Sequence, residues 1–328
     1  MLYGSQHKRK IGIVGGAASG KSTMLMALRP YINLFAIPGK HYRLVPDDPT
    51  LEKLDQLHER LEAQSFPDAT QLGVVNNFIF DLTDGNQTLH VETQDRPGGD
   101  YTSVPGNSQA YQDALEYLCT CDGLIILISV QNKNRENKKV MGANEINTLL
   151  NNLSNRLRKK YPNRVGPLPF RAAVCFTQYD DAEFFEFGRR RALFIKGNEN
   201  DLLNIPMCKM PKDRAVEPDK MRLLRDWFED WRDGMGVFRN WFYPELINFY
   251  FISSIGFYYE NDRNNPDRRI INWENCNNIE IQNLGGKQQS IIKSAPHIRP
   301  LFLLSPFAWL LSKEKMETDW FDQVLRRR

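Results

Sequence analysis

The feature that most constrains this chain is a short glycine-rich segment near the N-terminus, residues 15–22, which reads GGAASGKS. It fits the pattern G-x-x-x-x-G-K-[ST], in which glycines let consecutive backbone N–H groups point inward at a phosphate group. Residues 11–14 predict a buried strand before it, and residues 22–28 predict a helix after it that ends before Pro30. The positive end of that helix favours an anion, so the segment predicts a nucleotide phosphate site.

The residue types within this segment indicate separate roles. Lys21 supplies a cation for the β- and γ-phosphates, and Ser22 supplies a hydroxyl for Mg²⁺. The plain alternative, a glycine turn that carries a lysine by chance, requires neither the preceding strand nor the following helix. We therefore expect nucleotide contacts from Gly15, Ala18, Ser19, Gly20, Lys21, Ser22 and Thr23.

Composition narrows the class of protein. Of the 328 residues, 41% are hydrophobic and 25% are charged, as in ordinary soluble globular proteins, and the net charge of +3 is too small to predict a nucleic-acid partner. The five cysteines are odd in number and scattered, which indicates reduced thiols, and Cys119 and Cys121 lack a second pair at zinc-ligand spacing. We find no secretory h-region and no membrane-spanning apolar run, so we expect a cytoplasmic protein.

Hydrophobic periodicity predicts alternating strands and helices along the chain. The expected helices cover residues 51–64, 108–119, 144–161 and 298–311. The expected strands cover residues 74–82, 88–93, 124–130, 170–176 and 247–252. Such alternation predicts an α/β fold, a three-layer P-loop NTPase sandwich whose mostly parallel, right-handed sheet has helices on both faces.

Two stretches lack this periodicity. Residues 31–50 contain Pro38, Gly39, Pro46 and Pro49 and are predicted to be loop. Residues 258–293 are rich in Asn, Asp and Gly and are predicted to be either a long loop or an elaborated hairpin.

A second candidate segment, DRPG at residues 95–98, comes at the end of the strand predicted over 88–93. A carboxylate at the C-terminal end of a strand beside the phosphate loop is where Mg²⁺ or its bound water needs a partner, so Asp95 is a candidate metal ligand. Gly98 offers a backbone N–H that can approach the γ-phosphate closely. The alternative is an ordinary turn rich in Asp, Pro and Gly.

Two more polar segments follow predicted strands, TQYD at residues 177–180 and SSIG at residues 253–256. Ligands of open α/β sheets bind outside the carboxyl ends of the strands. One ligand can therefore contact all four segments, which is a stronger indication than any one of them.

The order of these segments resembles the P-loop GTPase family of the translation-factor and Ras type. In that comparison residues 15–22 match the phosphate loop, residues 95–98 match D-x-x-G, and residues 177–180 resemble the guanine-reading motif [NT]-K-x-D. In that motif the aspartate accepts two hydrogen bonds from guanine that adenine cannot donate. The resemblance implies GTP or GDP with Mg²⁺ as ligands, and base contacts from Thr177, Gln178, Asp180, Ser253 and Ser254.

The same resemblance implies a switch threonine whose hydroxyl reaches Mg²⁺ and the γ-phosphate. Thr70 is favoured because it lies just before the strand over 74–82, and Thr50 is the competing candidate in the same connection. The implied metal ligands are then Ser22, Thr70 and Asp95, and the residues implied in hydrolysis are Lys21, Thr70 and Gly98.

Two positions depart from the family pattern. Gln178 stands where the family has a lysine whose stem covers the purine, which weakens the expected base stacking. Gly99 stands where Ras-like members carry the glutamine that orients the attacking water, and Asp100 and Tyr101 are candidate substitutes. We therefore expect slow intrinsic hydrolysis, or hydrolysis that needs an arginine from a partner.

A closer resemblance is to the double-GTPase proteins of bacterial conflict systems. It rests on SFPDAT at residues 65–70, the long gap between Asp180 and Ser253, and the closing RPLFLLSPFAWLL at residues 299–311. It implies one GTPase-like domain over residues 1–328, with insertions at about 31–66, 181–247 and 258–293. The implied partners of this nucleotide-dependent switch are a second GTPase, an effector or an activating protein, and a homodimer is a further alternative.

Two other functions stay open on the sequence. A P-loop ATPase or kinase would need a different base reader and an arginine-rich lid, for which residues 189–191, RRR, are a poor candidate. A nucleotide-binding scaffold without turnover is consistent with Gly99.

Overall fold

The structure, a computed structural model, describes residues 8–177 and 238–311 with gaps. The longer stretches outside the described residues are 1–7, 103–107, 130–142, 178–237, 256–259, 262–268, 271–278, 294–302 and 312–328.

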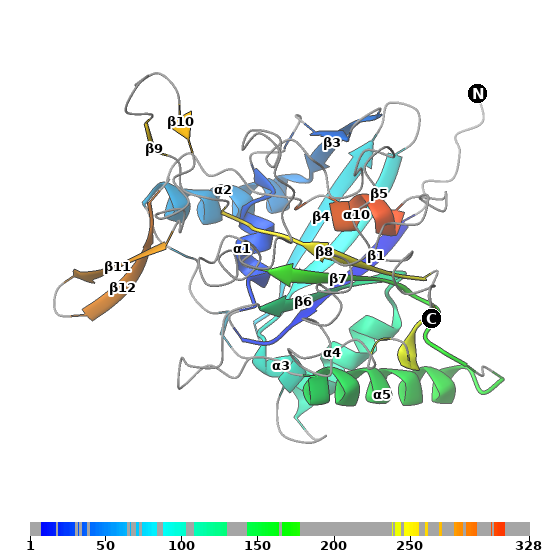
Figure 1. The fold of residues 1–328 in the computed structure, drawn as a ribbon. Helices are drawn as coiled ribbons and strands as arrows, with labels where there is room; N and C mark the ends of the chain where they lie inside the picture. The colour runs from blue at the N-terminus through cyan, green and yellow to red at the C-terminus, as the bar shows by residue number, and fades with distance from the viewer. Residues whose placement is uncertain are drawn as a thin grey trace, which may run out of the picture.

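An eight-stranded sheet forms the centre of the protein, in the order β2-β3-β4-β5-β1-β6-β7-β8 (Figure 1). Five neighbouring strands run parallel, namely β5 (Thr88–Asp95), β1 (Lys8–Gly15), β6 (Gly123–Ser129), β7 (Arg171–Thr177) and β8 (Ile247–Phe251). Three antiparallel strands extend the sheet, namely β4 (Asn76–Thr83), β3 (Lys40–Pro46) and β2 (Phe35–Ile37). The predicted strands all exist, with boundaries that differ by a few residues.

The central strands are buried on both faces, as their continuous apolar runs predict. In β6, Leu124 and Ile126 belong to one core cluster while Ile125 and Leu127 belong to the other. This alternation follows from the two-residue period of a strand. The sheet thus separates two hydrophobic cores.

Helices cover both faces and complete three layers (Figure 1). One core lies between the sheet and α4 (Gln109–Cys119) and α5 (Ala143–Lys160), next to the short helix α3 (Gly99–Thr102). The other lies between the sheet and α1 (Lys21–Met26), α2 (Asp48–Glu62) and α10 (Ser305–Leu311). The predicted three-layer α/β sandwich is confirmed.

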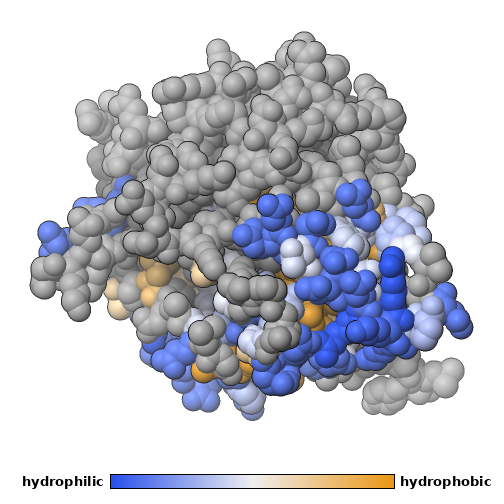
Figure 2. Space-filling model, turned by 90° about the horizontal axis from the view of Figure 1, so that it is seen from below, coloured by the Kyte–Doolittle hydropathy of each residue, from blue (hydrophilic) through white to orange (hydrophobic). Residues whose placement is uncertain are grey.

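Helix α5 shows how periodicity decides burial. Its buried side chains recur at helical spacing and face the core, at Ile146, Leu149, Leu150, Leu153 and Leu157. Its exposed face carries polar residues, and the view from this side of the molecule shows a mainly hydrophilic surface with small apolar spots (Figure 2).

The prediction of loop over residues 31–50 is wrong. Strands β2 and β3 form there, because the segment HYRLV at residues 41–45 favours a strand, and Pro46 and Pro49 stand where they cost little. Pro46 is the last residue of β3, and Pro49 lies in the first turn of α2, where a helix needs no N–H donor. Asp47 accepts a hydrogen bond from the Thr50 N–H at 2.9 Å, which caps α2 and starts it before residue 51.

The C-terminal part adds small antiparallel pairs and one helix. Strands β9 (Glu260–Asn261) and β10 (Arg269–Ile270) pair, and β11 (Ile279–Leu284) and β12 (Lys287–Ile292) form a hairpin that projects from the body (Figure 1). Of the two alternatives for residues 258–293, the structure therefore has the hairpin. The last described helix covers Ser305–Leu311, within the predicted range of 298–311. Among the described helices, none combines the length and apolar character that a membrane span requires.

Candidate functional site

The phosphate loop connects the end of β1 to the start of α1, and its glycines meet specific steric demands. Gly20 has a φ of 90°, which residues with a side chain rarely adopt. A Cβ on Gly15 would lie 2.3 Å from Ser19 Oγ, so a side chain there would displace Ser19. Ser19 donates its N–H to the Gly16 carbonyl oxygen at 3.3 Å, which closes the turn. Ala18 lies outside the described residues, and Thr23 is half-buried in the first turn of α1.

Lys21 folds back over this loop. Its Nζ donates to the carbonyl oxygens of Gly15 at 2.8 Å and Gly16 at 3.0 Å, and the residue is only 6% exposed. Burial lowers the pKa of Lys21 to about 8, against the opposing charges of Asp95 and Asp100. The cation is therefore held at the loop with little solvent around it.

Three oxygen-bearing side chains from distant parts of the chain meet beside Lys21. Ser22 Oγ donates to Asp95 Oδ2 at 2.7 Å, and Thr70 Oγ1 donates to the same oxygen at 3.2 Å. The two hydroxyl oxygens lie 3.3 Å apart. Sequence separations of 73 residues for Ser22 and Asp95 and 25 for Thr70 and Asp95 show that the fold, and not local chain geometry, assembles this cluster.

Asp95 is buried and only partly satisfied. Its Oδ1 atom has no hydrogen-bond partner within the described part of the chain. Burial raises the pKa of Asp95, while the hydrogen bonds from Ser22 and Thr70 and the charge of Lys21 oppose this shift. A carboxylate with one free oxygen, next to two hydroxyls, is a set of hard donors that suits Mg²⁺.

The structure distinguishes the two threonine candidates by position. Thr50 is 1% exposed, and its Oγ1 accepts a hydrogen bond from the Ile79 N–H at 2.7 Å. That contact joins the start of α2 to β4, away from the Ser22–Thr70–Asp95 cluster. Only Thr70 lies beside the residues that the sequence predicts as metal ligands.

Gly98 packs directly against the phosphate loop. A Cβ at this position would lie 2.2 Å from the Ala17 nitrogen and 2.3 Å from the Gly16 carbonyl carbon. Both are backbone atoms that cannot turn aside, so a side chain would push residues 95–98 away from the loop. The glycine is therefore required by the close approach of two backbones.

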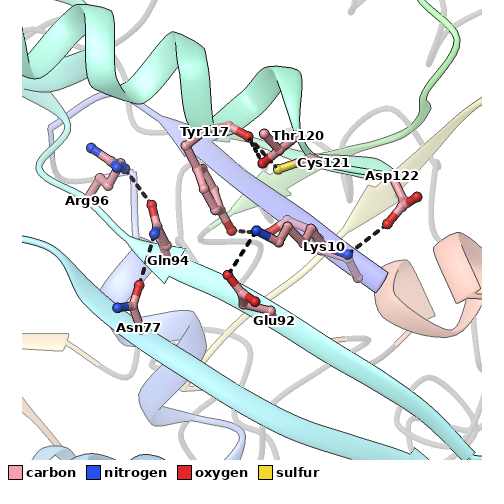
Figure 3. Close-up of polar contacts among 10 residues, drawn as sticks. Lys10, Asn77, Glu92, Gln94, Arg96, Tyr117, Thr120, Cys121 and Asp122 are labelled. Carbon is pink, nitrogen blue, oxygen red and sulfur yellow. Dashed lines mark hydrogen bonds and ion pairs between the residues drawn. The ribbon is translucent and has the colours of Figure 1, made fainter. Parts of the chain in front are cut away.

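A polar network of Arg96, Gln94 and Asn77 holds the start of the segment that follows β5 (Figure 3). Arg96 Nε donates to Gln94 Oε1 at 2.8 Å, and Gln94 Nε2 donates to Asn77 Oδ1 at 2.9 Å. The Arg96 guanidinium lies over the Tyr117 ring, 5.5 Å from its centroid. Sequence reasoning did not predict these partners, because nothing in the DRPG pattern indicates where the arginine points.

Two tyrosine hydroxyls anchor helices α3 and α4 to β1. Tyr101 donates to the Ile13 carbonyl oxygen at 3.2 Å, and Tyr117 donates to the Ile11 carbonyl oxygen at 3.3 Å. Burial raises the pKa of both hydroxyls. The Tyr101 hydroxyl therefore anchors α3 to β1 and does not take the place of the glutamine that is absent at Gly99.

Asp100, the second candidate substitute, is different. It is 1% exposed, and neither of its carboxylate oxygens has a hydrogen-bond partner among the described residues. Burial raises the pKa of Asp100, and the charges of Arg96 and Lys21 oppose that shift.

The segments predicted to read the base are described only in part. Thr177 Oγ1 donates to the Ile128 carbonyl oxygen at 3.4 Å, and the Ile252 N–H donates to the Phe176 carbonyl oxygen at 2.8 Å. The ends of β7 and β8 are therefore neighbours, with Ser253 fully buried and Ser254 half-buried. Gln178 and Asp180 lie outside the described residues. Recognition of guanine by Asp180 stays a prediction.

The cysteines and acidic residues do not suggest another metal centre. The described residues contain no group of three His, Cys, Asp or Glu side chains that could hold an ion. Cys119, Cys121 and Cys175 are free and buried. A cation at the Ser22–Thr70–Asp95 cluster would therefore rest on a single carboxylate, with hydroxyl and phosphate oxygens around it, as Mg²⁺ accepts.

Comparison with known proteins agrees with this geometry. Residues 9–167 match the family model described as Double-GTPase 2. The matched segment runs from β1 to beyond α5, so it contains the phosphate loop, the Ser22–Thr70–Asp95 cluster and Gly98. The expected resemblance to the double-GTPase family is confirmed over this segment. A search of curated proteins found no match to the chain.

Proposed function

We propose, from the match of residues 9–167 to the Double-GTPase 2 family, that this chain is a nucleotide-dependent switch that binds and slowly hydrolyses GTP. The family supports guanine-nucleotide binding. The observation that carries the proposal is the hydrogen-bonded cluster of Ser22, Thr70 and Asp95 beside Lys21. It unites a phosphate loop with a strand-end carboxylate and a loop threonine, which is the set of groups that a switch on the γ-phosphate needs.

The residues of the cluster fit Mg²⁺. Ser22, Thr70 and Asp95 offer oxygen atoms, and the buried Asp95 Oδ1 has no hydrogen-bond partner within the described residues. These three residues would hold the ion, directly or through water, together with phosphate oxygens. When bound, Mg²⁺ neutralises negative charge on the β- and γ-phosphates.

The chain's own groups would bind and orient GTP. The Lys21 ammonium would exchange its two carbonyl contacts for phosphate oxygens, which are far better partners for a buried cation. The backbone of residues 95–102 would change its position when the γ-phosphate is bound or lost, because Gly98 lies against the phosphate loop. Loss of the γ-phosphate would release Thr70 and this segment, and that change is the switch.

We also propose a cytoplasmic role in a bacterial conflict system, with a second GTPase, an effector or an activating protein as the partner. The double-GTPase description of the matched family supports a pairing of two GTPases. Gly99 supports activation by such a partner, because the chain lacks a glutamine at the position after Gly98.

A competition assay tests the nucleotide. Purified protein with Mg²⁺ is loaded with a fluorescent GTP analogue and challenged with equal concentrations of GTP, GDP and ATP. We expect GTP and GDP to displace the analogue and ATP to leave it bound. Equal displacement by ATP would favour a P-loop ATPase or kinase and contradict the proposal.

Two variants sharpen this assay. Lys21→Ala should abolish nucleotide binding, because it removes the only side-chain cation predicted at the phosphates. Asp180→Ala should weaken GTP binding and reduce the preference for GTP over ATP. An unchanged base preference in Asp180→Ala would count against the guanine-reading role of residues 177–180.

A second candidate function is a scaffold that binds GTP without turning it over. Gly99 favours it, since no side chain at that position can orient water. Single-turnover hydrolysis by the purified protein, alone and with candidate partners, separates the scaffold from the switch. Release of phosphate from bound GTP is the result expected for the switch.

A further inference from the structure

Helix α3 holds Asp100 in a fixed place two residues after Gly98. The Asp100 N–H donates to the Pro97 carbonyl oxygen at 3.1 Å, and the Tyr101 N–H donates to the Gly98 carbonyl oxygen at 3.2 Å. The Tyr101 hydroxyl ties the same turn to β1 through the Ile13 carbonyl oxygen. With Gly98 packed on the phosphate loop, the backbone of Asp100 is anchored to the phosphate site from two sides.

The Asp100 carboxylate is buried without a hydrogen bond among the described residues. The residue is 1% exposed, and within the described residues neither carboxylate oxygen accepts a hydrogen bond. Burying a carboxylate without partners is unfavourable, and native proteins normally avoid it. Such a group is expected where a bound molecule supplies the missing donor.

The charges around Asp100 locate that molecule. The carboxyl interacts electrostatically first with Arg96, just after β5, and next with Lys21, whose Nζ donates to the first two carbonyls of the phosphate loop. It interacts unfavourably with the exposed Asp113 on α4. Asp100 is therefore a second carboxylate near the phosphate-binding lysine, in addition to Asp95.

We propose that Asp100 is the catalytic residue that orients the water attacking the γ-phosphate and accepts its proton. This inference rests on the proposed GTP-binding function. Gly99 has no side chain for the task, and the Tyr101 hydroxyl is already bonded to β1. Asp100 alone among these three presents unpaired acceptor oxygens within the described residues.

The reaction balances with GTP and water alone. The water oxygen forms a bond to the γ-phosphorus, and the bond from that phosphorus to the bridging oxygen breaks, leaving the electron pair on GDP. One water proton moves to a carboxylate oxygen of Asp100 and then to the departing phosphate, so the carboxylate is restored. The products are GDP and inorganic phosphate.

Single-turnover hydrolysis of GTP by Asp100→Asn, compared with the wild type, tests this role. An amide cannot take the proton, so we expect the rate to fall about 100-fold or more, as for loss of a general base. The matched control is Asp113→Asn, which removes a nearby exposed carboxylate. Its rate should stay within about twofold of the wild type, because solvent and salt screen an exposed charge.

Two further readouts separate catalysis from structure. Asp100→Asn should bind GTP as tightly as the wild type and melt at the same or a higher temperature, because it removes an unpaired buried carboxylate. A variant that melts lower and binds GTP weakly would show a structural role and overturn the inference. Asp100→Glu, which keeps the carboxylate, should retain more activity than Asp100→Asn, and equal loss in both would also contradict it.

The pH dependence of the rate gives an independent check. As pH falls, protonation of Asp100 should slow hydrolysis by the wild type, and Asp100→Asn should lack this decline. The groups that act on this carboxyl are Lys21, Arg96 and Asp113. Hydrolysis by Asp100→Asn at the wild-type rate would overturn the role of Asp100 alone, whereas failure of the wild type to bind or hydrolyse GTP would overturn the proposed function.

Discussion

At the scale of single residues, Lys21 is a buried amine, so nucleotide binding is coupled to its protonation. Its folded-state pKa of about 8 lies below the ordinary value of 10.5 because burial disfavours the cation. Between these values the unfolded chain binds more protons than the folded one, so the stability of the nucleotide-free protein rises with pH across this window. Below it, Lys21 is charged in both states and its burial is unfavourable.

This shift predicts proton uptake on binding. At pH 9 most Lys21 side chains of the free protein are neutral, and a bound triphosphate requires the ammonium form. Calorimetric titrations of GTP in two buffers of different ionisation enthalpy should show uptake approaching one proton at pH 9 and little at pH 7. Equal heats in both buffers at pH 9 would contradict the placement of Lys21 against phosphate.

The two threonines provide a matched pair at the same scale. Thr50→Ala removes the acceptor of the part-buried Ile79 N–H, so it should lower the free energy of unfolding by about 1–2 kcal/mol and leave nucleotide affinity unchanged. Thr70→Ala should change the free energy of unfolding only slightly, but it should remove the preference for GTP over GDP. Chemical denaturation and nucleotide titration of both variants check this. A nucleotide effect in Thr50→Ala alone would reverse the assignment of the switch threonine.

At the scale of elements, strand and helix patterns predict most of the fold but not its edges. The core strands are found from sequence because their apolar runs are buried on both faces, as in β6 and β7. Strands β2 and β3 are missed because they are short or end at a proline, such as Pro46, and prolines are also typical of loops. Helix α3 is too short for periodicity to detect, and the orphan carboxylate of Asp100 becomes visible only with burial and contacts.

The contact between residues 95–102 and the phosphate loop makes a prediction about elements. Gly98→Ala would place a methyl group 2.2 Å from the Ala17 nitrogen, so this segment must move away from the loop. We expect GTP hydrolysis to be lost while the protein stays folded. Gly166→Ala is the control, because Gly166 lies between α5 and β7, outside the phosphate loop, and its φ of 105° makes alanine there act through backbone strain. It should cost stability of roughly 1–2 kcal/mol.

A Gly98→Ala protein that hydrolyses GTP at the wild-type rate would show that residues 95–102 do not need to reach the phosphate loop. Melting temperatures of both glycine variants, measured alongside the rates, show whether any loss of activity follows from unfolding.

At the scale of the whole molecule, one end of the sheet brings together segments that are far apart in the sequence. The carboxyl ends of β1 and β5 carry the phosphate loop and Asp95, and those of β7 and β8 carry Thr177 and Ser253. The sequence predicts this convergence because ligands bind at that edge of such sheets. It favours Thr70 over Thr50 as the threonine near Asp95, but the length of the connection leaves the contact itself to the structure.

The measurement that tests the central claim most directly is the affinity of GTP as a function of Mg²⁺ concentration, in the wild type and in Asp95→Asn. Asparagine can still accept hydrogen bonds from Ser22 and Thr70, so the fold should be retained. We predict that Mg²⁺ increases the affinity of the wild type for GTP. In Asp95→Asn this increase should be smaller by at least ~10-fold, the lower end of the loss seen when a residue that supports a metal site is changed. An identical response to Mg²⁺ in both proteins would contradict the claim that Ser22, Thr70 and Asp95 hold the ion.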